Sequence, residues 1–111
     1  MKIDDLTIGE AKQLVALFGS HTIPTEHGWE IGEVYFIRTV TMIDTGRLVA
    51  VTEHELVLED AAWIADTGRF TQALAEAEFG EVEPFPTGRV LIGRGSVIDA
   101  VQITVAPRLQ K

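Results

Sequence analysis

The sequence predicts a mainly β protein with some helix, in which an N-terminal helix precedes a five-stranded antiparallel sheet that curls into a small barrel. Three observations lead to this prediction. The chain opens with an amphipathic helical period, residues 34–105 are rich in β-branched and aromatic residues, and turn residues interrupt that stretch at short intervals. A flat sheet with one apolar face would leave that face in water, whereas a barrel buries it and removes most edges.

Length and composition exclude several classes of protein. A chain of 111 residues suits one domain over 1–111, and 46% hydrophobic residues with a mean hydropathy of +0.17 exclude disorder. The chain has no apolar run long enough to span a bilayer, no opening that resembles a signal peptide, and no cysteine, which excludes disulfides and thiol catalysis. A net charge of −8 argues against a membrane surface or a nucleic-acid polymer as the partner.

The first element is a helix over 7–18. Thr7 and Glu10 have the spacing of a capping box, in which each side chain satisfies a free backbone N–H of the other residue. The apolar positions fall on one helical face, at Ile8, Ala11, Leu14, Val15 and Phe18. The polar residues over 19–33 predict a loop, and we expect Trp29 to pack from it onto the core.

Three antiparallel strands follow as a meander, over 34–41, over 47–52, and from 56 toward 64. Their β-branched and aromatic residues favour extended structure. We expect Asp44-Thr45-Gly46 to form the first turn, with its glycine free to adopt a positive φ, and Glu53-His54 to form the second connection.

A helical insertion separates the third strand from the fourth. The turn Asp66-Thr67-Gly68 leads into residues 69–79, whose alanine, leucine and glutamate content favours a short helix that Gly80 ends. Residues 81–86 are extended, because two prolines forbid helix there. The remaining elements are a fourth strand over 89–92, a turn over 93–95 and a fifth strand over 97–105.

This order of elements is that of SH3-like and Sm-like small barrels. The run Gly46-Arg47-Leu48-Val49, followed by Leu56 through Ala61, resembles the Sm signature, in which a glycine opens the second strand and acidic residues accompany an apolar third strand. The resemblance covers 34–61 and 96–105 and implies the barrel fold. The insertion before the fourth strand departs from small Sm proteins, so their RNA site is not carried over.

A second resemblance spans most of the chain. It rests on Leu6-Thr7-Ile8-Gly9-Glu10, Ile37-Arg38-Thr39, Leu58-Glu59-Asp60-Ala61-Ala62-Trp63 and Ile98-Asp99-Ala100-Val101. These segments resemble those of a family of small tailed-phage proteins of unknown function. The resemblance implies a phage or prophage origin, and therefore the cytoplasm of an infected bacterial host, but it implies no known chemistry.

The Asp-Thr-Gly motif occurs twice, beginning at Asp44 and at Asp66. Aspartic proteases hold two such aspartates close enough to share a proton, so that one acts as the acid and the other as the base. Those enzymes follow the glycine with a small residue, whereas Arg47 and Arg69 stand here. We therefore interpret both motifs as turns and keep an aspartic-type protease acting through Asp44 as a remote alternative.

The predicted ligand-binding residues are arginines and aromatic residues, namely Arg38, Trp63, Arg69, Phe70 and Arg94. Arginine binds phosphate or carboxylate through two hydrogen bonds, and aromatic rings stack on nucleotide bases. The competing interpretation is that Arg38 and Arg69 pair with Glu59, Asp60 or Asp66. We expect no cofactor and no metal, because the spacing of His21 and His27 is not that of metal ligands on a helix.

These observations favour a non-enzymatic binding protein of a phage that sequesters a small nucleotide immune signal, an anti-defence sponge. We expect a homo-oligomer, because small barrels have exposed edge strands. The alternative is a structural or protein-interaction factor, either a virion accessory or an acidic inhibitor of a host protein. That inhibitor would gather Glu53, Glu55, Glu59, Glu76, Glu78 and Glu81 on one surface.

Overall fold

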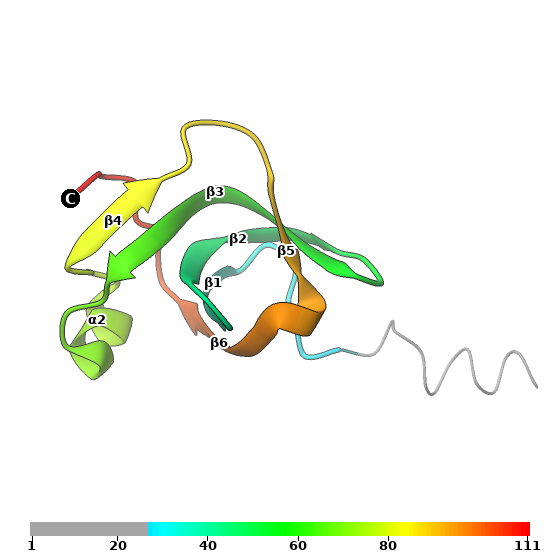
Figure 1. The fold of residues 1–111 in the computed structure, drawn as a ribbon, viewed down its shortest axis with the longest axis horizontal. Coiled ribbons are helices and arrows are strands. Elements are labelled where there is room, and N and C mark those ends of the chain that lie inside the picture. The colour runs from blue at the N-terminus through cyan, green and yellow to red at the C-terminus, as the bar shows by residue number, and fades with distance from the viewer. Residues whose placement is uncertain (1–26) are drawn as a thin grey trace, which may run out of the picture.

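The computed structural model describes residues 27–111, and the helix predicted over 7–18 lies outside them. The described chain is mainly β, with six strands and one α-helix (Figure 1). The elements in chain order are β1 (Val34–Thr39), β2 (Ile43–Val51), β3 (Glu55–Asp66), α2 (Phe70–Glu76), β4 (Glu81–Pro84), β5 (Val90–Gly93), the 3₁₀ turn η2 (Arg94–Ser96) and β6 (Val97–Ile103). No helix within residues 27–111 is long and apolar enough to cross a membrane.

The six strands form one antiparallel sheet, in which five follow the order β4-β3-β2-β1-β6 and β5 pairs with β3. The long strand β3 pairs with β5 along its first half, where Leu56 lies opposite Ile92, and with β4 along its second half, where Ile64 lies opposite Val82. Within the described chain no pairing joins β5 to β6, so the sheet is not closed and the predicted barrel is not confirmed.

Strand β3 bends in the middle, and its long arc crosses the molecule in Figure 1. Asp60 has a φ of 53°, and the pairing with β2 shifts register there, from Arg47 opposite Glu59 to Thr45 opposite Ala62. Aspartate is among the residues that best tolerate this left-handed conformation, and a bulge bends its strand. The bend lets one strand contribute to two cores.

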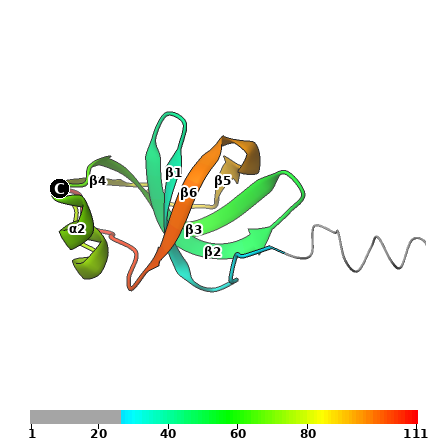
Figure 2. The ribbon, with the colours of Figure 1, turned by 90° about the horizontal axis from the view of Figure 1, so that it is seen from below.

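The apolar side chains form a core on each face of the sheet. The first core consists of Tyr35, Ile37, Leu48, Leu56, Leu58, Ala61 and Ile92. Trp29 packs against this core, as the sequence predicted, and the centroids of the Trp29 and Tyr35 rings lie 4.9 Å apart. The second core consists of Phe36, Ala62, Ile64, Ala73, Phe79, Val82 and Ile103, and α2 covers it at one end of the molecule (Figure 2).

The turn between the first two strands is not where the sequence predicted it. Asp44-Thr45-Gly46 lies inside β2, and the chain turns over residues 39–42 instead. The Thr39 N–H donates to the Met42 carbonyl at 2.8 Å, and the Thr39 hydroxyl bonds both backbone groups of Met42. A threonine hydroxyl therefore closes a turn in a stretch whose β-branched residues indicated a strand.

Gly46 also has a role other than the predicted one. It does not form a turn: a Cβ atom at Gly46 would stand 3.0 Å from the Leu58 Cβ and 3.3 Å from the Ala61 Cα. The bend of β3 brings the two backbones this close, so glycine is needed for the approach of β3.

Several other element boundaries differ from the prediction. Residues 81–84 form the additional strand β4, the third strand continues to Asp66, and the last strand ends at Ile103 rather than at 105. The predicted turn over 93–95 is a 3₁₀ turn, and α2 spans fewer residues than 69–79. Ala77, with a φ of 54°, ends α2, not Gly80. The turn at Asp66-Thr67-Gly68 is confirmed, because the Gly68 N–H donates to the Asp66 Oδ1 at 2.8 Å.

Candidate functional site

A surface hollow of about 440 Å³ opens between the β1–β2 hairpin and the end of β3. We call it the hairpin hollow and define it by its lining residues: Arg38, Thr39, Val40, Thr41, Met42, Ile43, Trp63, Ile64, Ala65 and Ile98. It forms because the registered pairing of β2 with β3 ends at Asp44 opposite Trp63, whereas β3 continues to Asp66. Beyond Trp63 the tip of the hairpin and the end of β3 are separate, and the hollow lies between them.

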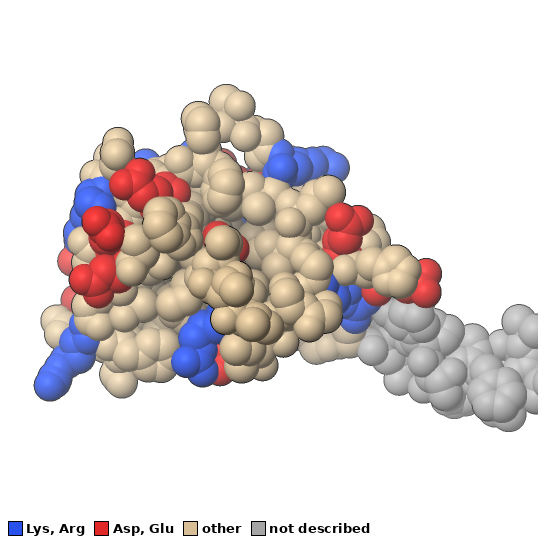
Figure 3. Space-filling view, viewed as in Figure 1, with Lys and Arg blue, Asp and Glu red and all other residues tan. Residues whose placement is uncertain are grey.

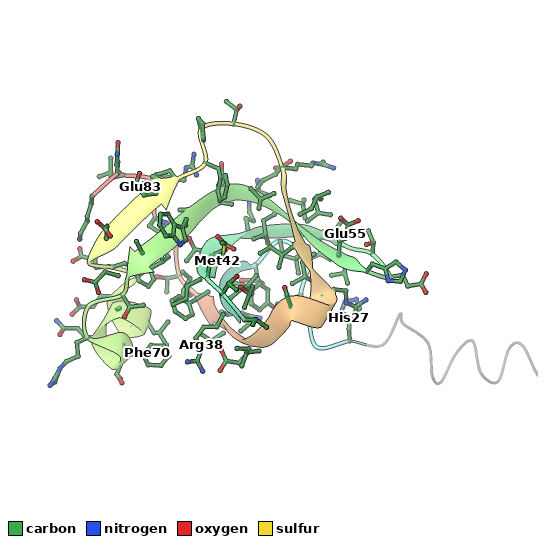
Figure 4. All side chains as sticks on the ribbon, viewed as in Figure 1. His27, Arg38, Met42, Glu55, Phe70 and Glu83 are labelled. Carbon is green, nitrogen blue, oxygen red and sulfur yellow. The ribbon has the colours of Figure 1, made fainter. Side chains whose placement is uncertain are left out.

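Four large apolar side chains around the hairpin hollow face solvent. The exposed fractions are 72% for Val40, 48% for Met42, 42% for Trp63 and 64% for Ile98. They come from the hairpin tip, from β3 and from the start of β6, so three separate segments supply one apolar surface. Figure 4 shows Met42 at this site, and most of the surface at the centre of the same view carries no charge (Figure 3). Grouped exposed apolar side chains of this kind mark interaction sites more often than scattered ones do.

Arg38 stands at the rim of the hollow and is already paired. Its guanidinium donates two hydrogen bonds to the Asp99 carboxylate, one of them from Nε to Oδ1 at 2.7 Å. These hydrogen bonds lower the pKa of the Asp99 carboxyl and raise the pKa of Arg38. The Arg38 Cζ also lies 5.7 Å from the ring centroid of Phe70. Figure 4 labels both residues. The pairing that competed with ligand binding is therefore present, but with an acid that the sequence did not indicate.

The five predicted ligand-binding residues do not all lie in one place. Arg38 and Trp63 line the hairpin hollow, and Phe70 lies beside Arg38. Arg69 precedes α2, and neither it nor Arg94 is among the lining residues. The Arg94 Nη1 donates to the carbonyl of Thr52 at 2.7 Å, at the β2–β3 turn. Of the five predicted residues, two thus line the hairpin hollow and a third lies beside one of them.

Val40, Met42 and Ile98 line the hollow but were absent from the predicted set. The prediction placed the first of them inside a strand, because the turn was expected at residues 44–46. A signal was available in the sequence, since Thr39 precedes Val40 and Met42 and a threonine hydroxyl can close a turn. It could not be distinguished from strand propensity in the same residues.

Asp44 is the strand partner of Trp63, which lines the hollow. It is 5% exposed, and its Oδ1 has no hydrogen-bond partner among the described residues; the buried Thr45 Oγ1 has none either. Burial raises the pKa of the Asp44 carboxyl.

The two Asp-Thr-Gly motifs are not brought together as a protease dyad. Asp66 follows Trp63 by three residues along β3, which places it about 10 Å farther on at the ordinary rise of a strand. Its Oδ1 accepts the Gly68 N–H of its own turn. The two aspartates therefore lie at different places in the sheet, one inside β2 and the other at the end of β3.

The acidic residues that the alternative of an acidic inhibitor would gather on one surface are divided between the two ends of β3. Glu53 and Glu55 lie at the β2–β3 turn, whereas Glu76, Glu78 and Glu81 lie around α2 and β4. Glu59, between them, binds Arg47 at 2.9 Å and Arg89 at 3.2 Å, and these hydrogen bonds lower its pKa. Figure 3 shows acidic atoms at both ends of one face. This distribution weighs against a single acidic inhibitory face.

A second hollow, of about 410 Å³, lies between the bend of β3 and the loop over 85–89. Its charged groups already bind one another or the backbone, since Arg89 pairs with Glu59 and Arg108 donates to the Ala61 carbonyl at 2.6 Å. Residues 27–111 contain no group of three histidine or acidic side chains placed to hold a metal ion. The hairpin hollow is therefore the stronger candidate for a functional site.

Comparison of the chain with protein-family models, with curated proteins and with solved structures finds no match.

Proposed function

We propose that the chain is a non-enzymatic binding module that docks a protein partner in the hairpin hollow. The observation that carries the proposal is the convergence of Val40, Met42, Trp63 and Ile98, all exposed, around one hollow. The core of a protein interface is enriched in aromatic residues and methionine and depleted in charge. The arginine at the rim supports a protein partner over a free anion, because Asp99 already neutralises Arg38.

Site-specific photo-crosslinking tests this proposal. Met42 is replaced by the photoreactive residue p-benzoylphenylalanine, and the matched control carries it in place of Leu91, an exposed apolar residue on β5 outside the hollow. In cells that naturally carry the gene, we expect one discrete protein adduct from position 42 and none from position 91. The adduct should weaken when Trp63→Ala is added. Absence of an adduct at position 42, or equal adducts at both positions, would overturn the proposal.

The predicted sponge for a small nucleotide is the second candidate, and one observation favours it: Arg38 and Trp63 both line the hairpin hollow. An aromatic face could stack on a base and the guanidinium could bind a phosphate. Paired native and denaturing mass spectrometry of gently purified protein separates the two functions. A nucleotide-sized excess mass that disappears on denaturation favours the sponge, and its absence favours a protein partner. The native mass also tests the predicted homo-oligomer.

We further propose that β1, β2, β3, β5 and β6 form an SH3-like small barrel. The strand order β5-β3-β2-β1-β6 and the 3₁₀ turn between β5 and β6 support this assignment. Residues of both end strands, Ile92 and Val90 on β5 and Val97 and Ala100 on β6, also pack on the first core. Phage origin and an anti-defence role remain predictions from the sequence.

A further inference from the structure

Acidic residues of β4 and of the end of β3 lie next to the β3 wall of the hairpin hollow. Glu83 lies opposite Trp63 across the β3–β4 pair, and Glu81 lies opposite Asp66. Directly opposed residues of two antiparallel strands project from the same face of the sheet and are close neighbours. A carboxylate therefore flanks the exposed indole of Trp63. Asp66 at the end of β3 and Glu81 at the start of β4 add two more.

These three carboxylates form no ion pair with a cationic side chain of residues 27–111. The ion pairs of residues 27–111 involve other acids, and the polar partners of this group are neutral: Gly68 N–H for Asp66, and the Gln110 amide for Glu83 at 3.2 Å. Like charges directly opposed across a sheet destabilise it. The Asp66–Glu81 pair thus has a cost in stability that a cationic partner would relieve.

The backbone beside the hollow suits an extended segment. The registered pairing of β3 with β2 stops at Trp63, while β3 runs on to Asp66 with β4 on its other side. An added peptide strand uses such an unpaired edge for its main chain and adjacent pockets for alternate side chains. Here the adjacent pocket is the apolar hollow.

We infer that the hairpin hollow takes an extended peptide segment whose large apolar side chain is flanked by lysine or arginine. This inference rests on the proposed docking function and adds the chemistry of the partner. The apolar side chain fills the space between Met42 and Trp63, and the basic residues lie against Glu81, Glu83 and Asp66. Charge complementarity of this kind selects among partners and strengthens association at low salt.

An NMR titration of the full chain tests the inference with two capped hexapeptides. Both have tryptophan-leucine at the centre, flanked on each side by two lysines in one peptide and by two glutamines in the other. We expect the lysine peptide to shift the amide signals of Val40–Met42 and Trp63–Asp66 and to bind about 3- to 10-fold tighter than the glutamine peptide at low salt. The difference should shrink toward unity as salt screens exposed charges.

A pair of matched variants locates the charge effect. The double variant Glu81→Gln, Glu83→Gln should lower the affinity for the lysine peptide by about 2- to 10-fold and leave that for the glutamine peptide unchanged. The control, Glu53→Gln with Glu55→Gln, removes the same charge at the other end of β3 and should leave the ratio of the two affinities unchanged.

The outcomes separate this inference from the proposed function. Equal binding of the two peptides at the hollow overturns the basic partner and leaves peptide docking in place. If both double variants lower the affinity for the lysine peptide equally, the effect is one of net charge alone, and the inference is also overturned. If neither peptide shifts the amides around the hollow, both the inference and the proposed docking of a protein segment are overturned.

Discussion

Asp44 is a carboxyl group whose burial opposes its ionisation, since its Oδ1 has no partner among the described residues. A folded-state pKa above the unfolded value means that the folded state prefers the proton. The destabilisation caused by burying the ionised Asp44 carboxylate is absent below the ordinary pKa of aspartate and complete above the raised pKa. We expect Asp44→Asn to raise the free energy of unfolding by about 1 kcal/mol at pH 7 relative to the unsubstituted chain. This gain in stability should vanish in acid.

Urea unfolding across the acid-to-neutral range measures this difference. The exposed substitution Glu76→Gln is the control, because it removes a carboxylate without changing a buried group. This account of the burial would be contradicted if Asp44→Asn and the unsubstituted chain are equally stable at pH 7. It would also be contradicted if the variant stays more stable below the ordinary pKa of aspartate.

Asp99 is the opposite case, because the hydrogen bonds from Arg38 hold its pKa below the ordinary value. The stabilisation is present above the unfolded pKa and is lost as the pH falls through the lowered folded pKa. We expect Arg38→Gln to return the pKa of Asp99 toward that of a free aspartate. A ¹³C carboxyl titration by NMR measures the change, and an unaltered titration of Asp99 would show that the ion pair does not persist in solution.

At the scale of the element, the bend of β3 depends on the fit between two strands. Gly46→Ala should destabilise the fold by about 1–3 kcal/mol, because its Cβ would contact Leu58 and the Ala61 backbone. Gly93→Ala is the control, since a Cβ at that position meets no atom within 4 Å. Thermal unfolding followed by circular dichroism compares the two variants. Equal stability would mean that β3 shifts to accept the methyl group.

The elements that could be predicted are those whose sequence signal is local. Alternating β-branched residues identified the strands from 34 onward, and the Asp66-Thr67-Gly68 turn followed from its own side-chain chemistry. The first turn could not be predicted, because Asp44-Thr45-Gly46 satisfies the local rules for a turn while its pairing with β1 and β3 places it in a strand. Strand β4 was missed because its pairing with β3 is not local either.

The candidate site is predictable only in part for the same reason. Arg38 and Trp63 could be selected by residue type, since arginine and tryptophan are common in binding sites. The hollow itself depends on where β2 and β3 separate, and this is a property of sheet register. The acid that neutralises Arg38 lies 61 residues away along the chain. No spacing rule in the sequence connects the two.

At the scale of the whole molecule, the net charge of −8 predicts self-repulsion in the folded state. Raising the ionic strength from about 10 mM to about 200 mM shortens the screening length from about 30 Å to under 10 Å. We expect the Tm to rise by roughly 2–5 °C, measured by differential scanning calorimetry. A variant with glutamine at Glu53, Glu55, Glu76 and Glu81 should lose most of this salt effect. A Tm that is flat or falls with salt in the unsubstituted chain would show that the ion pairs outweigh the repulsion.

The strand β3 supplies Leu56 and Leu58 to one core and Ala62 and Ile64 to the other, so a change on it must suit both faces of the sheet at once. The hairpin tip at Val40, Thr41 and Met42 belongs to neither core, although it forms the opposite wall of the hollow. One wall is thus constrained by folding and the other is nearly free of that constraint. Evolution could retarget such a surface by altering three consecutive residues, so divergence among descendants of this chain should concentrate at the hairpin tip.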